Sequence, residues 1–198
     1  LKVVHLGSNF NTSKIKIKQD FTHSYSFLEK KYILFVATIE PRKRQDIVLS
    51  AFEKLQKKYP HLVLVFVGSF GWKIKSLKNK IKNHPLKEKN FFHLENIDDN
   101  ALKLLYKNAF LVTYLSDYEG FGLPIAESLF YNNITIVSNN SSIKEVGKNY
   151  VDYLKTNDDK NLVEIISKYL KDENYYIQRK EYLKTNYKNI TWNKFYKK

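Results

Sequence analysis

Two carboxylates stand at the ends of a glycine-rich run, EGFGLPIAE, that begins at Glu119 and ends at Glu127. The glycines of this run allow a ligand to approach the backbone closely because they carry no Cβ, and Pro124 suits the first turn of a helix. The N–H groups at a helix start, together with the positive end of the helix dipole, attract anions. We therefore expect phosphate at three neighbouring backbone groups, those of Phe121, Gly122 and Leu123.

The two glutamates need a different partner, because a carboxylate beside a phosphate is repelled unless it accepts hydrogen bonds from a neutral group. Sugar hydroxyls are neutral donors that often accompany phosphate in one ligand. A nucleotide sugar carries both kinds of group. The run therefore predicts a nucleotide-sugar site around Glu119, Gly120 and Glu127.

A basic loop supplies cations that can neutralise a diphosphate. Arg42 and Lys43 follow a predicted strand in the segment TIEPRKRQ. Arginine binds two oxygens through its planar guanidinium group, whereas lysine acts as a point charge. In so lysine-rich a chain, basic residues in a loop are also expected of an ordinary solvated surface, and their significance depends on lying across the sheet edge from Glu119. Gly68, in VGSFGW, either lets a ligand approach the backbone or forms a plain turn.

Other chemistries find little support in the sequence. The five histidines are scattered without the spacing of metal ligands, so we expect no metal site and no bound cofactor. Two pairs of aspartates, at 98–99 and 158–159, are explained better by helix capping than by a divalent ion. Neither a serine, histidine and aspartate arrangement nor a phosphate loop ending in Gly-Lys-Ser or Gly-Lys-Thr is recognisable.

An alternation of strands and helices must position these residues. Nearly continuous apolar runs such as YILFVAT and LVLVFV are typical of strands buried on both faces of a parallel sheet. The expected strands span 32–38, 62–67, 91–94, 110–115, 134–138 and 150–154, and the expected helices span 47–59, 72–83, 98–108, 123–131, 142–146 and 162–170. This pattern predicts an α/β fold, a Rossmann-like open sheet of about six parallel strands flanked by helices.

Ligands bind such sheets beyond the carboxyl ends of the strands. Every loop of chemical interest follows a predicted strand, so we expect all of them at one edge of the sheet: 38–44, 68–72, 95–98, 115–123 and 138–142.

The composition indicates a folded chain whose surface attracts anions. Of its 198 residues 43% are hydrophobic, and 34 Lys plus Arg against 20 Asp plus Glu give a net charge of +14. This charge fits a solvated surface, an anionic membrane surface or nucleic acid, and we rank them in that order. No apolar run approaches the length of a membrane span and no signal peptide is recognisable. We therefore expect a cytoplasmic protein, with peripheral association at the inner face of the cytoplasmic membrane as an alternative.

Five runs taken together resemble a known family. They are ATIEPRKRQDIVLSAF, LVLVFVGSFGW, LENIDDNALKLLYKNAF, SDYEGFGLPIAESL and SNNSSIKEV, and they follow one another in register within residues 32–170. They look like the C-terminal, nucleotide-sugar-binding domain of retaining GT-B glycosyltransferases, the glycosyl transferases group one (family 4 in the carbohydrate-enzyme classification). The resemblance implies one half of a GT-B fold and metal-independent transfer of a hexose from a UDP- or GDP-linked donor to a glycan or lipid-linked acceptor.

The resemblance also implies a role for each matching residue. The implied catalytic residues are Glu119, which faces the donor sugar, and Arg42 and Lys43, which bind the diphosphate. The implied donor-binding residues are Glu127 for the ribose hydroxyls, Asn96 and Ile97 for the base, and, around the phosphates and the sugar, Thr38, Gly68, Gly120, Phe121, Gly122 and Leu123. Glu145 lies in a segment that the family places near the same cleft.

The chain departs from the family pattern in one loop. Many relatives have Gly-Arg after the first strand, where this chain has Ala37 and Thr38. One phosphate-binding arginine is therefore missing unless Arg42 substitutes for it.

We expect the family's other domain, which supplies the acceptor site, to lie outside these 198 residues. The chain has no methionine and opens at Leu1 in the strand-like run LKVVHL, so we expect a fragment whose missing part lies upstream. Residues 1–30 then correspond to the last strand and hinge of that domain, and 31–170 to the donor-binding domain. Residues 171–198, with Trp192 in a last helix, correspond to the helices that cross back to the absent domain.

Three functions follow, in order of preference. The first is the donor-binding domain of a retaining glycosyltransferase, inactive as an isolated fragment, whose acceptor binds through the missing domain. The second is a non-catalytic nucleotide-binding or scaffold domain of the same fold. A nucleic-acid-binding module is third and predicts steeply salt-dependent binding to DNA or RNA. We expect no nucleic-acid partner.

Overall fold

The computed structural model describes residues 26–140 and 143–188. The strand expected at residues 2–6 and the last helix, with its cap at Thr191 and with Trp192, lie outside these ranges. Within them, every expected strand and helix is present, with shifts of a few residues at the ends.

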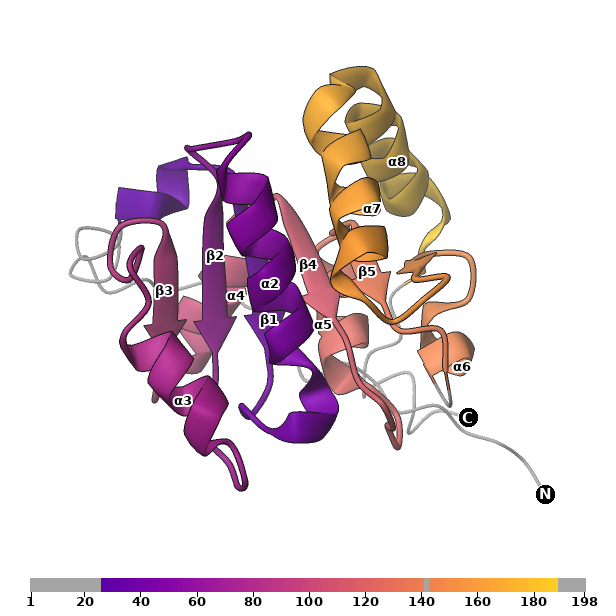
Figure 1. The fold of residues 1–198 in the computed structure, drawn as a ribbon. Coiled ribbons are helices and arrows are strands. Elements are labelled where there is room, and N and C mark those ends of the chain that lie inside the picture. Colours follow the sequence, from indigo (N-terminus) through magenta and orange to yellow (C-terminus); the bar gives the residue numbers. More distant parts are fainter. Residues whose placement is uncertain (1–25, 141–142, 189–198) are drawn as a thin grey trace.

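One sheet of six strands forms the centre of the molecule, and every strand pair in it is parallel. The order is β3-β2-β1-β4-β5-β6 (Figure 1). The strands are β1 (Tyr32–Val36), β2 (Val63–Val67), β3 (Phe91–Leu94), β4 (Leu111–Tyr114), β5 (Thr135–Val137) and β6 (Asp152–Tyr153). The continuous apolar runs of β1, β2 and β4 are buried throughout or nearly so, as expected of strands covered on both faces.

Helices cover both faces of this sheet. They are α2 (Gln45–Gln56), α3 (Lys75–Lys82), α4 (Asp99–Asn108), α5 (Leu123–Phe130), α6 (Ile143–Gly147), α7 (Asp159–Lys171) and α8 (Glu173–Asn186). Figure 1 shows α2, α3 and α7 in front of the sheet and α4 and α5 behind it. This division follows from right-handed crossovers, because the chain moves in one direction from β1 to β3 and in the other from β4 to β6.

The strand order therefore reverses between β1 and β4, which pair with each other. At such a switch point the loops after the two strands leave toward opposite faces and open a crevice, which is where ligands bind in open α/β sheets. The loops in question are those that carry Arg42 and Glu119.

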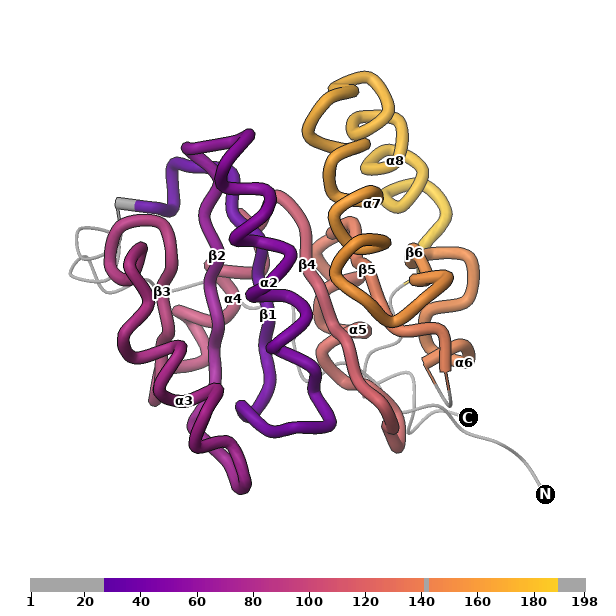
Figure 2. The backbone as a smooth tube through the Cα atoms, in the orientation of Figure 1, coloured from indigo at the N-terminus to yellow at the C-terminus, as the bar shows by residue number. Residues whose placement is uncertain are grey.

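The two helix layers seal two clusters of buried side chains, one on each face of the sheet. Helix α7 contributes Leu162, Ile166 and Tyr169 to the buried core. Figure 2 shows the last two described helices, α7 and α8, which pack against each other, while α7 also packs against α2.

Helix caps account for two of the aspartates. Asp98 accepts a hydrogen bond from the N–H of Ala101 at the start of α4 (2.8 Å), and Asp158 accepts one from the N–H of Asn161 at the start of α7 (2.8 Å). One aspartate of each pair thus has the capping role expected of it.

One helix boundary was wrong. The helix expected from Trp72 begins only at Lys75, because the loop before it continues the pairing of β1 with β2. Ile39 donates to the carbonyl of Ser69 (2.9 Å), and Gly71 donates to the carbonyl of Ile39 (2.8 Å). These backbone bonds keep residues 69–71 in an extended conformation. The spacing of apolar residues in the sequence does not predict such bonds.

No helix within the described ranges is long and apolar enough to cross a membrane.

Candidate functional site

A cavity of about 360 Å³ opens at the carboxyl ends of β1 and β4. It brings together seven of the residues selected from the sequence: Thr38, Arg42, Lys43, Glu119, Phe121, Gly122 and Leu123. Ala37, Glu40, Tyr114 and Pro124 complete its lining. The expectation that the loops after β1 and β4 meet at one edge of the sheet is confirmed.

The loop after β1 is fixed by its own hydrogen bonds. Pro41 begins a short 3₁₀ helix, η2 (Pro41–Lys43), and Arg44 then adopts a left-handed conformation (φ 49°) from which α2 starts. Gln45 donates from Nε2 to the carbonyl of Thr38 (2.9 Å), and the N–H of Asp117 donates to the carbonyl of Arg42 (2.8 Å). The second bond joins the loop after β1 to the loop after β4.

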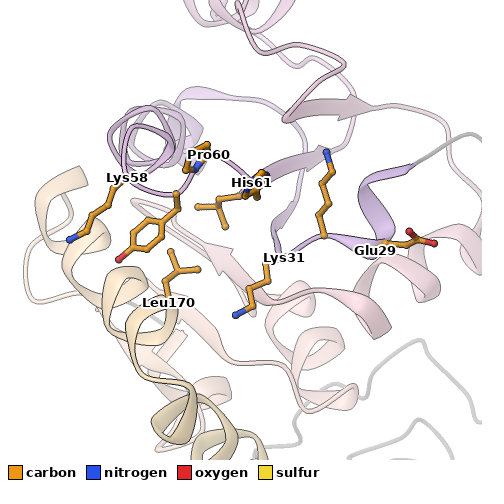
Figure 3. Close-up of a pocket in the computed structure, with 9 residues that line it drawn as sticks. Glu29, Lys31, Lys58, Pro60, His61 and Leu170 are labelled. Carbon is orange, nitrogen blue, oxygen red and sulfur yellow. The ribbon is translucent and has the colours of Figure 1, made fainter.

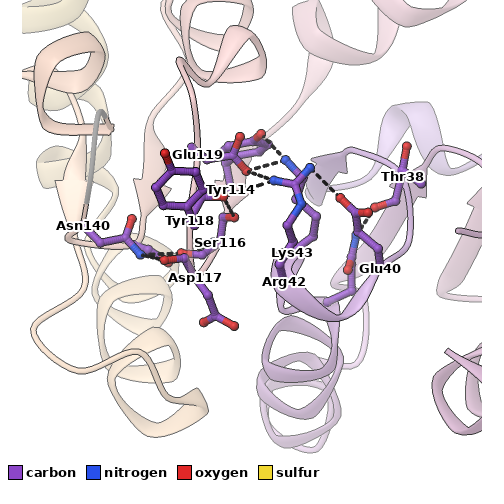
Figure 4. Close-up of polar contacts among 12 residues, drawn as sticks. Thr38, Glu40, Arg42, Lys43, Tyr114, Ser116, Asp117, Tyr118, Glu119 and Asn140 are labelled. Atoms are coloured by element: carbon purple, nitrogen blue, oxygen red, sulfur yellow. Dashed lines mark hydrogen bonds and ion pairs between the residues drawn. The ribbon is translucent and has the colours of Figure 1, made fainter. Parts of the chain in front are cut away.

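A buried ion pair lies at the centre of the cavity (Figure 4). Lys43 and Glu119 are only 6% and 7% exposed, and the ammonium group of Lys43 contacts Oε1 of Glu119. Lys43 also donates from Nζ to the hydroxyl of Tyr114 (2.7 Å). A buried ammonium is tolerated because a carboxylate and a hydroxyl take the place of its water shell.

Arg42 forms a second, more exposed bridge across the cavity mouth. Its Nη1 lies 3.2 Å from Oε1 of Glu119, and its Nη2 lies 2.7 Å from Oε1 of Glu40. It also donates to the carbonyl of Tyr118 (3.1 Å). Each of the two cations is therefore paired with a carboxylate, so a bound diphosphate would compete with these carboxylates for the cations.

Tyr114 is a site residue that we did not predict from the sequence. Burial raises the pKa of its hydroxyl, and the neighbouring Glu119 carboxylate raises it further. The group is therefore neutral at physiological pH and can both donate and accept hydrogen bonds. Its only signal in the sequence is its place at the last position of β4, directly before the loop that carries Glu119.

The start of α5 forms the wall of the cavity that we expect to bind phosphate. Gly122 occupies the N-cap in a left-handed conformation (φ 83°), and Pro124 lies in the first turn. A Cβ on Gly122 would lie 3.1 Å from Cδ1 of Ile125, so the tight turn favours glycine by both its dihedral angle and its packing. The positive end of the helix dipole therefore faces Lys43 and Arg42 across the cavity.

Glu127 occupies a separate, buried position on α5. Its Oε2 accepts a hydrogen bond from the hydroxyl of Tyr106 on α4 (3.1 Å). Burial raises the pKa of Glu127, an effect that the Tyr106 hydrogen bond partly offsets. Tyr106, like Tyr114, was not predicted as a site residue. The two glutamates of the EGFGLPIAE run thus have different surroundings, with cations beside Glu119 and a phenol beside Glu127.

The other selected residues lie outside the cavity lining. Asn96 is exposed in a left-handed conformation (φ 55°) after β3, and the neighbouring Ile97 packs against the core cluster on the α4 side. Gly120 is exposed in the loop before α5, and Glu145 is exposed on α6.

The backbone conformation and the packing at Gly68 leave no room for a side chain. Its φ is 139°, and a Cβ there would lie 2.2 Å from the carbonyl oxygen of Ala37. The close backbone approach that this glycine allows is an approach to the end of β1.

Two further observations concern the rest of the described chain. A cavity of about 540 Å³ lies at the opposite, amino edge of the sheet, beside the residues that precede β1 and β2 (Figure 3); its lining includes Lys31, Lys58, His61 and Leu170. Within residues 26–140 and 143–188, no group of three or more His, Asp or Glu side chains is arranged to hold a metal ion.

Comparisons with known proteins agree with this geometry. The family model described as "Glycosyl transferases group 1" matches residues 17–189. The serotype-specific mannosyltransferase WbdA of Escherichia coli is 35% identical over 120 residues, which are 61% of this chain and 15% of that protein. The O-antigen chain mannosyltransferase RfbU of Salmonella typhimurium is 29% identical over 158 residues, 77% of this chain and 43% of that protein. The chain thus spans less than half the length of these relatives.

Solved structures share the fold at low sequence identity. Anabaena HepE in complex with UDP-glucose superimposes with a TM-score of 0.73 at 19% identity, over 92% of this chain and 51% of that one. The C-terminal domain of a glycosyl transferase group 1 family protein, LpcC, from Francisella tularensis gives a TM-score of 0.68 at 19% identity. In that case 88% of this chain and 96% of the other are covered.

Proposed function

The chain belongs to the glycosyl transferases group 1 family, and from this premise we propose that it is the donor-binding domain of a retaining glycosyltransferase. The observation that carries the proposal is the cavity in which Arg42 and Lys43 face the start of α5 with Glu119 between them. Two cations and a helix N-terminus are suited to a diphosphate, and a carboxylate is suited to sugar hydroxyls.

The proposed reaction breaks the anomeric bond between the sugar and a nucleoside diphosphate. In the transition state the leaving oxygens gain negative charge, and the sugar ring gains positive charge. Arg42, Lys43 and the backbone N–H groups at the start of α5 stabilise the leaving diphosphate, so these protein groups take the role that a metal ion plays in other enzymes. Glu119 orients the sugar and favours the positive charge on its ring.

Glu127 then binds the ribose hydroxyls, and the loop at Asn96 and Ile97 borders the base. The hydrogen bond from Tyr106 supports this role because it fixes the orientation of the Glu127 carboxylate. We propose a UDP- or GDP-linked hexose as donor and a glycan or lipid-linked acceptor. Mannose is the first sugar to test, because two relatives are named mannosyltransferases.

Nucleotide binding tests the first half of the proposal. We expect UDP or GDP to raise the melting temperature of the chain, with ADP as a comparison. Arg42→Ala is expected to weaken this binding about tenfold or more, because it removes a charge-assisted contact to phosphate. Arg179→Ala is the matched control. It removes an arginine that forms an ion pair with Asp152 on the edge strand β6, which two strands separate from β1. Equal losses in both variants would contradict the assigned diphosphate site.

Catalysis is tested in the complete enzyme by Glu119→Gln. Glutamine keeps a partner for the buried Lys43, whereas removing the side chain would leave an unpaired buried charge and destabilise the fold by about 3 to 5 kcal/mol. We expect turnover to fall by a factor of about 100 or more while binding of the nucleoside diphosphate changes little. Unchanged turnover would rule out the role given to Glu119.

The alternative is a nucleotide-binding scaffold domain without catalysis. This alternative also predicts nucleotide binding, but it predicts that the complete protein does not release UDP or GDP from a sugar donor when an acceptor is present.

Peripheral binding to an anionic membrane is a further proposal, supported by the net charge of +14 and tested by sedimentation with vesicles containing phosphatidylglycerol.

A further inference from the structure

Exposed aromatic side chains lie beside the cavity. In the described part of the chain, the large apolar side chains that are exposed are Trp72 (59%), Tyr118 (69%) and Ile177 (46%). Tyr118 precedes Glu119 directly, and Trp72 bonds to Glu40, which lines the cavity. A large aromatic surface exposed next to a ligand cavity is a common mark of a recognition site.

Trp72 is held in a fixed orientation. Its indole Nε1 donates to Oε2 of Glu40 (3.2 Å), while Oε1 of the same carboxylate binds Arg42 (2.7 Å). Lys73 places its ammonium group 5.3 Å from the centre of one indole ring. The exposed ring therefore does not depend on a ligand for its position.

The loop that carries Trp72 is also rigid. It is bonded to the loop after β1 through Ser69 and Gly71, and His93 on β3 bonds the carbonyl of Gly68 (2.7 Å). A Cβ on Gly71 would lie only 3.0 Å from the carbonyl oxygen of Ile39, so the two loops are in direct contact. A ligand that stacks on Trp72 would thus lose little binding energy to ordering of the protein.

From this geometry we propose that Trp72 and Glu40 form a subsite for a sugar ring of the acceptor glycan, an inference that rests on the proposed glycosyl transfer. The indole ring offers an apolar surface to the C–H face of a pyranose. The carboxylate of Glu40 is an acceptor for the hydroxyls at the edge of the same sugar.

The surface at Trp72 could contact either an acceptor sugar or the base of the donor. The positions of Trp72 and Glu127 relative to the sheet favour the acceptor sugar. Glu127 and Tyr106 lie on α5 and α4, behind the sheet, so a ribose on Glu127 places the base on that side. Trp72 precedes α3 in front of the sheet and reaches the cavity through Glu40 and Arg42. Its loop therefore reaches the cavity from the face of the sheet opposite to Glu127 and Tyr106.

Tryptophan fluorescence can test the subsite directly. The chain has two tryptophans, so the variant Trp192→Phe leaves Trp72 as the sole indole. We expect α-linked mannotriose or maltotriose to change its emission in a saturable way, and uridine and guanosine to leave it unchanged. Absence of a saturable change with both trisaccharides would overturn the proposal, and so would an equal change with a nucleoside.

Variants then locate the binding by saturation-transfer NMR, which does not require an indole. Trp72→Ala and Glu40→Gln are each expected to weaken trisaccharide binding at least fivefold. Ile177→Ala removes the exposed apolar side chain of α8 and is expected to have no effect. Losses of the same size in Ile177→Ala would show general surface adhesion and would refute the subsite.

UDP and GDP binding is measured on the same variants. Nucleotide binding that persists in Trp72→Ala while trisaccharide binding is lost supports both proposals. Nucleotide binding without any trisaccharide binding contradicts the subsite alone, whereas failure of both nucleotides to bind the parent chain contradicts the proposed function.

Discussion

At the scale of single residues, the site depends on the way in which buried charges are matched. Lys43 and Glu119 neutralise each other inside the cavity, and Tyr114 provides a neutral third partner. We propose that an arriving diphosphate offers the cations a stronger anionic partner, so that Glu119 becomes available to a sugar. Glu127 accepts a hydrogen bond from the hydroxyl of Tyr106, and burial is the largest cause of its raised pKa.

The titration of Glu127 leads to a prediction about stability. The pKa of this carboxyl is raised above 4.5 in the folded state, so the folded protein retains a proton that the unfolded chain has lost. Its contribution to stability is complete below pH 4.5 and is lost as the pH rises through the folded pKa. We expect Glu127→Gln to be more stable than the parent at pH 7, and the difference to close below pH 4.5, in thermal unfolding from pH 4 to 8. A difference independent of pH would contradict burial as the cause.

The left-handed conformation of Arg44 leads to a second prediction. A non-glycine residue at φ 49° is strained, and Arg44 is held there partly by ion pairs with Asp46 and Asp117. Arg44→Gly and Arg44→Ala both lose these pairs, but only glycine relieves the strain. We expect the glycine variant to be more stable by about 1 kcal/mol in urea unfolding.

A helical position provides the control for this comparison. Lys54 lies within α2, where alanine stabilises a helix by about 1 kcal/mol relative to glycine. The order of the two variants should therefore reverse at Lys54, and the same order at both positions would show that backbone strain is not responsible.

At the scale of elements, the carboxyl ends of β1 and β2 act as one rigid unit. The pairing continues past both strands into residues 39 and 70, and Gly68 lies against the carbonyl of Ala37 at the junction. The loops that carry Glu40 and Trp72 are fixed to each other before any ligand binds. The loop after β4 joins this unit through the bond from Asp117 to Arg42.

Substitution at Gly68 tests this unit. A Cβ would lie 2.2 Å from a backbone oxygen, and the φ of 139° disfavours a side chain, so Gly68→Ala should lower the free energy of unfolding by about 3 kcal/mol or more. Gly120→Ala is the matched control, because no described atom beyond its two chain neighbours lies within 4 Å of its added Cβ. Chemical denaturation of both variants measures the difference, and equal stability would contradict the close contact.

At the scale of the whole molecule, the cavity is built at one edge of a single sheet. All of its lining comes from the carboxyl edge of one sheet, while the relatives are more than twice as long as the matched segment. An acceptor must be held against the donor sugar for transfer to be fast, since orientation contributes much of the rate of a two-substrate reaction. The sugar subsite that we propose at Trp72 and Glu40 contributes to this orientation of the acceptor.

This geometry predicts that the chain binds the sugar donor but transfers the sugar only slowly. We expect the 198-residue chain to bind a nucleoside diphosphate sugar and to transfer its sugar at least 1,000 times more slowly than the complete enzyme. Release of nucleoside diphosphate with and without acceptor measures both rates. Efficient transfer by this chain alone would show that the acceptor site is complete within it.

The sequence by itself determined the sheet, most of the helices and the edge at which the site lies. Continuous apolar runs identify strands covered on both faces, and the aspartates at 98 and 158 mark helix starts, because burial and capping act within a few residues. It also selected seven of the residues that line the cavity, since a glycine, a helix start and charges near strand ends have local reasons to be there, and Thr38 followed from the family resemblance.

Only the tertiary structure decided which side chains meet. Lys43 and Tyr114 are 71 positions apart, and they touch because the strand order places β4 beside β1. The same packing joins Glu127 to Tyr106, Trp72 to Glu40, and Gly68 to the end of β1. Local patterns record whether a segment is buried, whereas the partner of a buried polar group depends on the order of strands and on loop conformations, which the pattern of a single segment does not contain.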